Sequence, residues 1–278
     1  MIYILTAILS ITLLSLTMRK ATLNTDTLWG VIQANYITAA TVMTILTLKT
    51  PNTNIAPFTI ILGAITGLSY TVGMYLNLTL MGKKGAAITS SMIQLAVIIP
   101  ITVSIFIYNE TITRNQFLGI TLAVISLPLL AAKPMKKLEV DKKLLPKIIT
   151  TILVVGFSQL SSKILIQTGY GNQSNYFFQA IFTSAALLVT PLTWKNRAKI
   201  KKKDTVFGIG IGIFNILSNM SLLLALTTLP GAIVFTVSSA GSLFLVTISA
   251  LIIFKEMTSK SNLIGIILTL IAVILVNV

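Results

Sequence analysis

The chain contains no cysteine and no histidine, and only 6 of its 278 residues are acidic. Without cysteine there is no disulfide framework, thiol nucleophile or thiolate metal ligand. Without histidine the chain lacks the side chain that most often binds metals or acts as a general base near neutral pH. It also lacks a glycine-rich phosphate-binding loop that ends in lysine. We therefore expect no enzymatic activity, no metal site and no cofactor.

Charge of either sign is scarce. Charged residues make up 10% of the chain and hydrophobic residues 55%, whereas a soluble protein carries about 25% charged residues. The composition is typical of a polytopic membrane protein. The formal net charge of +15 could indicate nucleic-acid binding, but the basic residues stand in loops between apolar runs, where they orient a membrane protein. We expect contact with membrane lipids and none with nucleic acid.

A membrane-spanning helix needs about 20 mainly apolar residues, and ten stretches of the chain qualify. They are approximately 2–18, 28–48, 56–80, 86–108, 115–132, 147–168, 175–193, 205–226, 231–254 and 261–277. The first stretch has no basic residue before it and no obvious cleavage site, so we predict a spanning helix there and not a secretory signal. No part of the chain predicts a soluble domain.

A pattern in the middle of the chain recurs near its end, with a constant offset of 146 residues. The paired positions are Gly85 and Gly231, Glu110 and Glu256, Arg114 and Lys260, and Gly119 and Gly265. We interpret each copy as a hairpin of two spanning helices, with the glutamate and the base in its turn. The repeat predicts a five-helix unit at 1–132, a basic linker at 133–146 and a second five-helix unit at 147–278. Because five is odd, the two units would enter the membrane in opposite senses.

The basic residues predict the orientation. All but three of the 21 basic residues fall in loops at one end of the predicted bundle, and the exceptions are Lys49, Arg114 and Lys163. Cytoplasmic loops of membrane proteins collect lysine and arginine. We therefore expect a multi-pass protein of the cytoplasmic (inner) membrane with both termini outside.

These features resemble the drug/metabolite transporter superfamily, specifically its ten-helix EamA-like members. The resemblance rests on two five-helix halves, each ending in a small-residue pair, an apolar helix, a glutamate, a glycine and a last apolar helix. Here these are Gly85-Ala86, Glu110 and Gly119, and then Gly231-Ala232, Glu256 and Gly265.

The resemblance implies an all-α membrane fold of ten transmembrane helices in two inverted five-helix repeats. It also implies alternating-access carriage of a small metabolite or drug-like solute, such as an amino acid or another neutral or zwitterionic compound. Helices 56–80, 86–108, 205–226 and 231–254 would line a central cavity. Many relatives have cytoplasmic termini, which the basic loops here contradict.

Polar side chains within the predicted spans are candidates for lining that cavity. They are Tyr70, Asn77, Gln94, Gln159, Lys163, Asn215, Asn219 and Ser238. Amides that face lipid are costly, so these residues should face protein or water. Hydrogen bonding between helices, without a cavity, is the alternative. Lys163 has two further readings, because its stem could extend to the membrane surface near Gly169 or bind an anionic group of a solute.

The repeated motif residues and Pro100 are candidates for structural or gating roles. Glu110 and Glu256 each precede an apolar helix, and we predict that they accept hydrogen bonds from its free N–H groups. Alternatively, they form gating ion pairs with Arg114 and Lys260. Pro100 should kink its helix, and the second half has valine at the equivalent position.

Two pairs of glycines indicate how the helices pack. The spacings Gly63-x3-Gly67 and Gly208-x3-Gly212 predict close helix contacts.

None of the acidic residues lies in the middle of a predicted span, where a proton-coupled pump usually keeps an ionisable group. The pattern therefore favours a facilitator or exchanger. A lipid-linked carrier or flippase, and a non-transporting membrane scaffold, are the alternatives. The expected partners are a small-molecule substrate and membrane lipids, with the protein a monomer or homodimer.

Overall fold

The computed structural model describes residues 2–49, 54–84, 86, 89–90, 93, 95–131, 145–255 and 260–277. These residues form α-helices and short 3-10 helices, and no strand occurs among them. Seven helices in this part of the chain are long and apolar enough to cross a membrane. The all-helical membrane fold is therefore confirmed. Ten spans stay a prediction, because the expected helix 86–108 is described only in part and the helices at 114–131 and 260–277 are not among the seven.

Two pairs of helices have the same bounds in the two halves of the chain, apart from a constant offset. The first half contains α1 (Ile2–Asn24), α2 (Leu28–Lys49), α3 (Pro57–Lys84), α5 (Ile98–Phe106) and α6 (Arg114–Ala131). The second half contains α7 (Leu145–Gln167), α8 (Ser174–Lys195), α9 (Lys202–Leu226), α10 (Gly231–Ile253) and α11 (Lys260–Asn277). The bounds of α2 and α8 differ by 146 residues at both ends, as do those of α6 and α11. This is the offset of the repeated sequence motif.

The chain leaves α5 and α10 in the same way. Asn109 and Lys255 have positive φ angles of 50° and 51°, and these two residues are again 146 positions apart. A left-handed residue after a helix turns the chain away from the helix axis. Asparagine adopts this conformation more readily than lysine does. The equivalent turns therefore share a backbone conformation although the residues differ.

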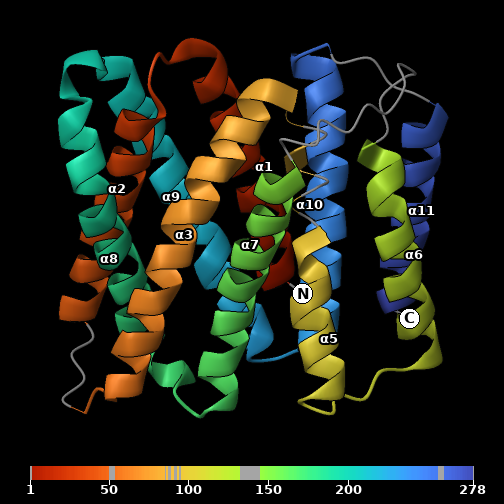
Figure 1. Ribbon diagram of the computed structural model, residues 1–278. Coiled ribbons are helices and arrows are strands. Elements are labelled where there is room, and N and C mark those ends of the chain that lie inside the picture. Colours follow the sequence, from red (N-terminus) through yellow and green to blue (C-terminus); the bar gives the residue numbers. More distant parts are fainter. Residues whose placement is uncertain are drawn as a thin grey trace.

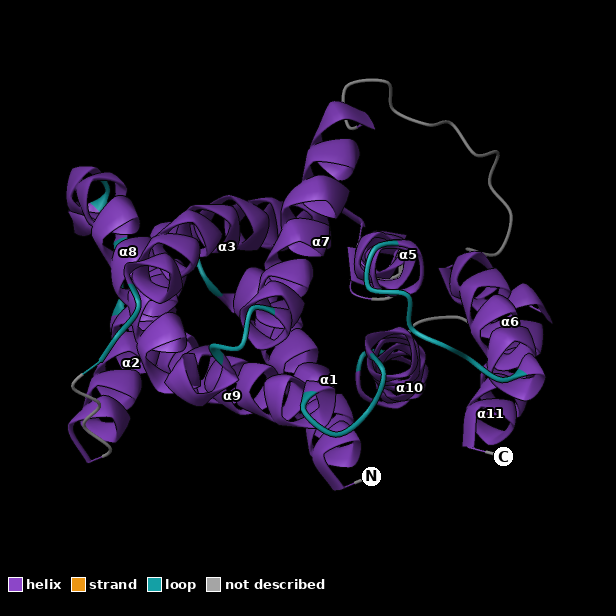
Figure 2. Cartoon of the chain, turned by 90° about the horizontal axis from the view of Figure 1, so that it is seen from below, coloured by secondary structure: helices purple, strands orange, loops and turns teal. Residues whose placement is uncertain are grey.

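The helices stand side by side in one bundle. In Figures 1 and 2, α2 and α8 form one edge and α6 and α11 the other, with α5 and α10 beside the second pair. The ends of α1, α3 and α8 and the starts of α2 and α9 lie at the upper end of Figure 1. Residues there include Arg19, Lys20, Lys83 and the basic run 195–203, so we call this the basic end. Both chain termini lie in the lower half of Figure 1.

Two buried clusters hold the bundle together. The larger lies among α1, α2, α3, α8 and α9 and contains the fully buried rings of Tyr36, Phe178 and Phe182. The second surrounds α10 and contains Phe235 and Leu243. Large apolar side chains also cover much of the outer surface, as expected for helices that face lipid hydrocarbon and not water.

Glycines permit the closest helix contacts. A Cβ atom at Gly208 would lie 2.6 Å from the carbonyl oxygen of Val31, and one at Gly212 would lie 2.7 Å from that of Asn35. Only residues without a side chain allow α9 to approach the α2 backbone this closely. The other predicted glycine pair places α3 against α8 in the same way. The close contacts predicted from both spacings are confirmed.

The helix that contains Pro100 is irregular. A 3-10 helix, η1 (Leu95–Val97), runs directly into α5. Proline lacks the N–H that would bond to the carbonyl four residues earlier, which is that of Ala96. A Cβ atom at Gly156 would lie 3.0 Å from this carbonyl oxygen. The glycine thus lets α7 pack against the irregular segment.

Candidate functional site

A cavity of about 200 Å³ lies between α1, α3, α7, α9 and α10. Its lining includes six of the residues predicted from the sequence, namely Tyr70, Asn77, Gln159, Asn215, Asn219 and Ser238. Gln94 lies outside the described residues. Lys163 does not line the cavity.

A chain of hydrogen bonds joins α2, α3 and α9 beside the cavity. The Tyr36 hydroxyl donates to the Tyr70 carbonyl oxygen at 2.5 Å, and the Tyr70 hydroxyl donates to Asn219 Oδ1. Asn219 Nδ2 donates to Asn215 Oδ1 at 2.7 Å. Asn215 Nδ2 in turn donates to Asn35 Oδ1 at 3.2 Å. For Asn215 and Asn219, hydrogen bonding between helices therefore accounts for the buried amides.

Two other amides in the cavity wall are not satisfied. Asn77 Oδ1 and Gln159 Oε1 are buried and have no hydrogen-bond partner. Leaving a buried acceptor unpaired costs about 1–3 kcal/mol, and buried polar groups are normally bonded. Because both side chains line the cavity, the donors that they need can come from a molecule bound there.

Two serine hydroxyls add acceptors to the cavity wall. Ser158 donates its hydroxyl proton to the Val154 carbonyl at 2.7 Å, and Ser238 donates to that of Val234 at 2.6 Å. These bonds within the helix leave the hydroxyl lone pairs available to other donors. None of the described residues that line the cavity is charged. The site is therefore polar and neutral, and it offers free acceptors.

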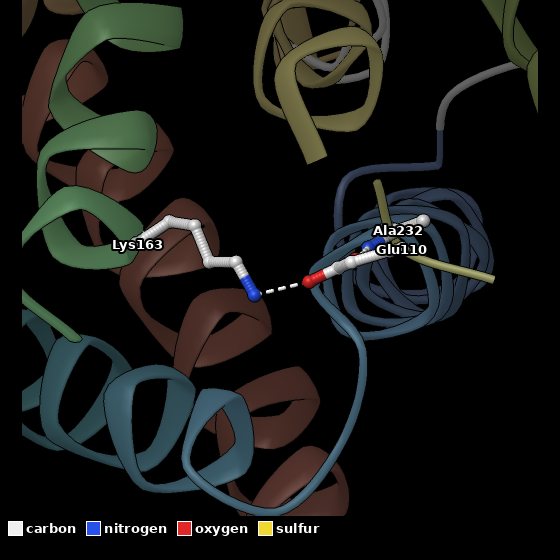
Figure 3. A network of polar contacts seen from close by, with 3 residues as sticks. All are labelled: Glu110, Lys163 and Ala232. Atoms are coloured by element: carbon white, nitrogen blue, oxygen red, sulfur yellow. Dashed lines mark hydrogen bonds and ion pairs between the residues drawn. The ribbon is translucent and has the colours of Figure 1, made fainter. Parts of the chain in front are cut away.

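A buried ion pair lies beside the cavity. Lys163 Nζ in α7 donates to Glu110 Oε1, and the two side chains are 3% and 11% exposed. Figure 3 shows Lys163 reaching across to Glu110, which lies next to Ala232. Glu110 Oε2 accepts a 3.1 Å hydrogen bond from the Ala232 backbone N–H. Ala232 is in the first turn of α10, where the helix dipole stabilises a negative charge.

This arrangement corrects two expectations for Glu110. It caps α10, and not α6, which follows it in sequence; it pairs with Lys163, and not with Arg114. The first turn of α6 is capped by its own residues. The Thr113 N–H donates to Gln116 Oε1 at 3.0 Å, and the Gln116 N–H donates to Thr113 Oγ1 at 3.2 Å.

Lys163 adopts neither of its expected roles. Its ammonium group points towards Glu110 (Figure 3) instead of the surface near Gly169. The Glu110 carboxylate occupies the position that an anionic solute group would take beside the amine. The ring of Tyr108 also lies near Lys163, with 5.9 Å between its centroid and Nζ.

The remaining motif residues lie apart from the cavity. Arg114 and Lys260 begin α6 and α11. Gly119 and Gly265 are buried in these two helices, which pack on each other. Gly231 begins α10, beside the ion pair. Gly85 and Glu256 lie outside the described residues.

Two residues beside the cavity were not predicted from the sequence. Asn35 and Tyr36 of α2 are fully buried, and both belong to the hydrogen-bond chain. The argument that selected Asn215, an amide within an apolar span, applies equally to Asn35. The sequence therefore contained a signal for it. Tyr36 gave no such signal, because tyrosine occurs in apolar spans for many reasons.

The basic end contains an exposed ion pair between two loops. Asp26 precedes α2, and Lys201 precedes α9. The hydrogen bond to Lys201, with smaller effects from the charges of Lys201 and Lys203, lowers the pKa of Asp26. The same hydrogen bond raises the pKa of Lys201. Exposed pairs of this kind contribute little to stability, so this contact links two loops and is not a candidate site.

Comparisons with known proteins agree with this architecture. An uncharacterized protein of Haemophilus influenzae is 26% identical over 183 residues, which are 65% of this chain and 62% of that protein. The chain thus matches less than two thirds of this relative's length. A solved crystal structure superposes with a TM-score of 0.76 over 99% of this chain and 98% of its own, at 12% identity; this likeness shows the fold alone. The sequence model of the EamA-like transporter family matches residues 145–278. These residues, just under half of the chain, thus match the EamA-like transporter family, part of the drug/metabolite transporter superfamily.

Proposed function

We propose that the protein carries a small neutral or zwitterionic solute across the cytoplasmic membrane by alternating access. The observation that carries the proposal is the neutral cavity in which Asn77 Oδ1 and Gln159 Oε1 are buried without partners. A membrane scaffold would satisfy its amides between helices and need no cavity. A transporter keeps such groups for its substrate, because an unpaired acceptor rejects solutes that bring no donor.

The size and chemistry of the cavity support a solute that donates hydrogen bonds. Its volume of about 200 Å³ is below the range of about 300–1,000 Å³ that is usual for drug-sized ligands. Acceptors from amides and hydroxyls line it, and its described lining contains no cation to bind a strong anion. Small metabolites with N–H or O–H groups fit this description better than anionic ones do.

Alternating access rests on two halves of similar structure. We propose that residues 1–132 and 147–278 are inverted five-helix repeats. The helix bounds offset by 146 residues support this assignment. So do the contacts, because α2 packs on α9 as α8 packs on α3, and α1 packs on α9 as α7 packs on α3. Inverted repeats give a transporter two related conformations around one central site.

The basic end is proposed to face the cytoplasm, because lysine and arginine collect in cytoplasmic loops. The native chain has no cysteine, so one introduced thiol reports its own position. Asn172→Cys, at the end opposite the basic end, should react with a membrane-impermeant maleimide in intact cells. Lys202→Cys, at the basic end, should react only after lysis. The reverse pattern would place both termini in the cytoplasm.

Solute flux tests the function directly. Purified protein in proteoliposomes would be supplied with mixed amino acids and nucleosides, with and without a pH gradient. We expect saturable flux that is independent of the gradient and reduced by Asn77→Leu and Gln159→Leu. Gln33→Leu is the control, because this amide bonds to Thr190 and does not line the cavity. Flux that is equal in all variants, or absent for every solute, would contradict the proposal, and flux that requires the gradient would reject the uncoupled mechanism.

A further inference from the structure

We propose that the Lys163–Glu110 pair is the gate that closes the cavity at the end away from the basic loops. This inference deepens the proposed transport function and rests on it. The pair would hold α7 against the start of α10 in the conformation described here. It would break when the cavity opens to that side.

The position of the pair relative to the cavity is the first argument. Lys163 follows Gln159 by four residues on α7, which is about one helical turn on the same face. Ala232 precedes Phe235 by three residues on α10. Gln159 and Phe235 both line the cavity, and Lys163 does not. The ion pair therefore lies one turn beyond the cavity on both helices.

The second argument is that the pair joins segments that must separate. Lys163 belongs to α7, Glu110 to the loop after α5, and Ala232 to α10. In the proposed opening, the path from the cavity to this end passes between α7 and α10. Both oxygens of Glu110 bridge that gap, one bonded to each helix. The carboxylate is therefore the contact that opening would have to break.

Close packing around the pair is the third argument. A Cβ atom at Gly231 would lie 2.5 Å from Ser104 Oγ and 3.3 Å from Lys163 Cε. The missing side chain lets the lysine stem lie against the start of α10. Ser104 Oγ is itself buried, so α5, α7 and α10 come close together here.

Electrostatics make the closed state depend on both partners. An unpaired charge within a membrane protein is costly, so loss of either side chain leaves the other in an unfavourable site. The uncompensated group is best accommodated where water can reach it, which is the open conformation. Neutralising one partner should therefore shift the equilibrium towards opening at this end.

Thiol accessibility tests the gate without knowledge of the solute. Ser238→Cys places a single thiol in the cavity, and the reference variants Asn172→Cys and Lys202→Cys identify the two membrane faces in proteoliposomes. From the Asn172 face, we expect slow maleimide labelling of Ser238→Cys. Adding Glu110→Gln or Lys163→Met should increase this rate at least about tenfold, a shift of about 1.4 kcal/mol in the opening equilibrium. Arg114→Gln is the matched control and should leave the rate unchanged.

An unchanged labelling rate in folded Glu110→Gln and Lys163→Met proteins would overturn the gate. Altered labelling without flux in the native protein would instead contradict the proposed transport function and leave the gate in place.

Discussion

The Tyr70 hydroxyl of α3 donates a hydrogen bond to Asn219 Oδ1 of α9, so this single contact joins the two halves of the chain at the cavity wall. Tyr70 also accepts a hydrogen bond at its carbonyl oxygen from Tyr36 of α2. Three helices thus meet through one side chain. Any movement of α3 relative to α9 has to alter this bond.

Tyr70→Phe should lower stability, because it removes the donor and leaves Asn219 Oδ1 unpaired in a buried site. An unpaired buried acceptor costs about 1–3 kcal/mol, so the thermal unfolding midpoint in detergent should fall. Tyr3→Phe is the control, because Tyr3 is 40% exposed. Equal midpoints for both variants would show that the bond contributes nothing to the folded state.

Asn77→Leu and Asn219→Leu should separate function from stability. Asn77 Oδ1 has no partner in the folded protein, so its removal should not lower the unfolding midpoint. It should still reduce flux about two- to tenfold, the effect of one lost hydrogen bond of about 0.5–1.5 kcal/mol. Asn219→Leu should lower the midpoint, because Tyr70 and Asn215 would lose their partner. A midpoint loss in Asn77→Leu as large as that in Asn219→Leu would favour the scaffold reading.

Gly212→Ala should weaken the contact between α9 and α2. The added methyl would lie 2.7 Å from the backbone oxygen of Asn35, which cannot move aside as a flexible side chain would. Overpacking of this kind costs about 1–3 kcal/mol. Gly210→Ala is the matched control in the same helix, because its methyl would meet Thr17 Cγ2 at an ordinary 3.7 Å. That variant should be neutral or stabilised by up to about 1 kcal/mol, as alanine favours helix over glycine; a loss of midpoint there as large as in Gly212→Ala would contradict the packing argument.

The sequence predicted features that depend on local pattern. Apolar run lengths predicted the helices. The spacing of Gly208 and Gly212 predicted a close helix contact, and the structure shows that α2 is the partner. The cost of an amide in lipid predicted that Asn77, Gln159 and Asn215 face inward, and all three line the cavity. Each of these inferences needs only neighbours along one helix.

The partners of charged residues could not be predicted in the same way. Glu110 has Arg114 four residues away, and sequence distance favoured that pairing. The structure brings Lys163 to Glu110 from 53 positions away, because α7 and the start of α10 converge beside the loop after α5. Tertiary packing chose the partner, and a single sequence contains no record of it. Asn35 differs from Glu110, because the cost of an amide in lipid predicts an inward-facing side chain there from the sequence alone.

Thr113→Ala should loosen the first turn of α6, whereas Glu110→Gln should not. Thr113 and Gln116 satisfy each other's backbone N–H groups at the start of this helix, and removing such a cap costs about 0.5–2 kcal/mol. Glu110 bonds instead to the Ala232 N–H of α10. Hydrogen exchange in detergent should therefore become faster at the start of α6 in Thr113→Ala and at the start of α10 in Glu110→Gln. Faster exchange at the start of α6 in Glu110→Gln would show instead that Glu110 caps α6, as its position in the sequence predicted.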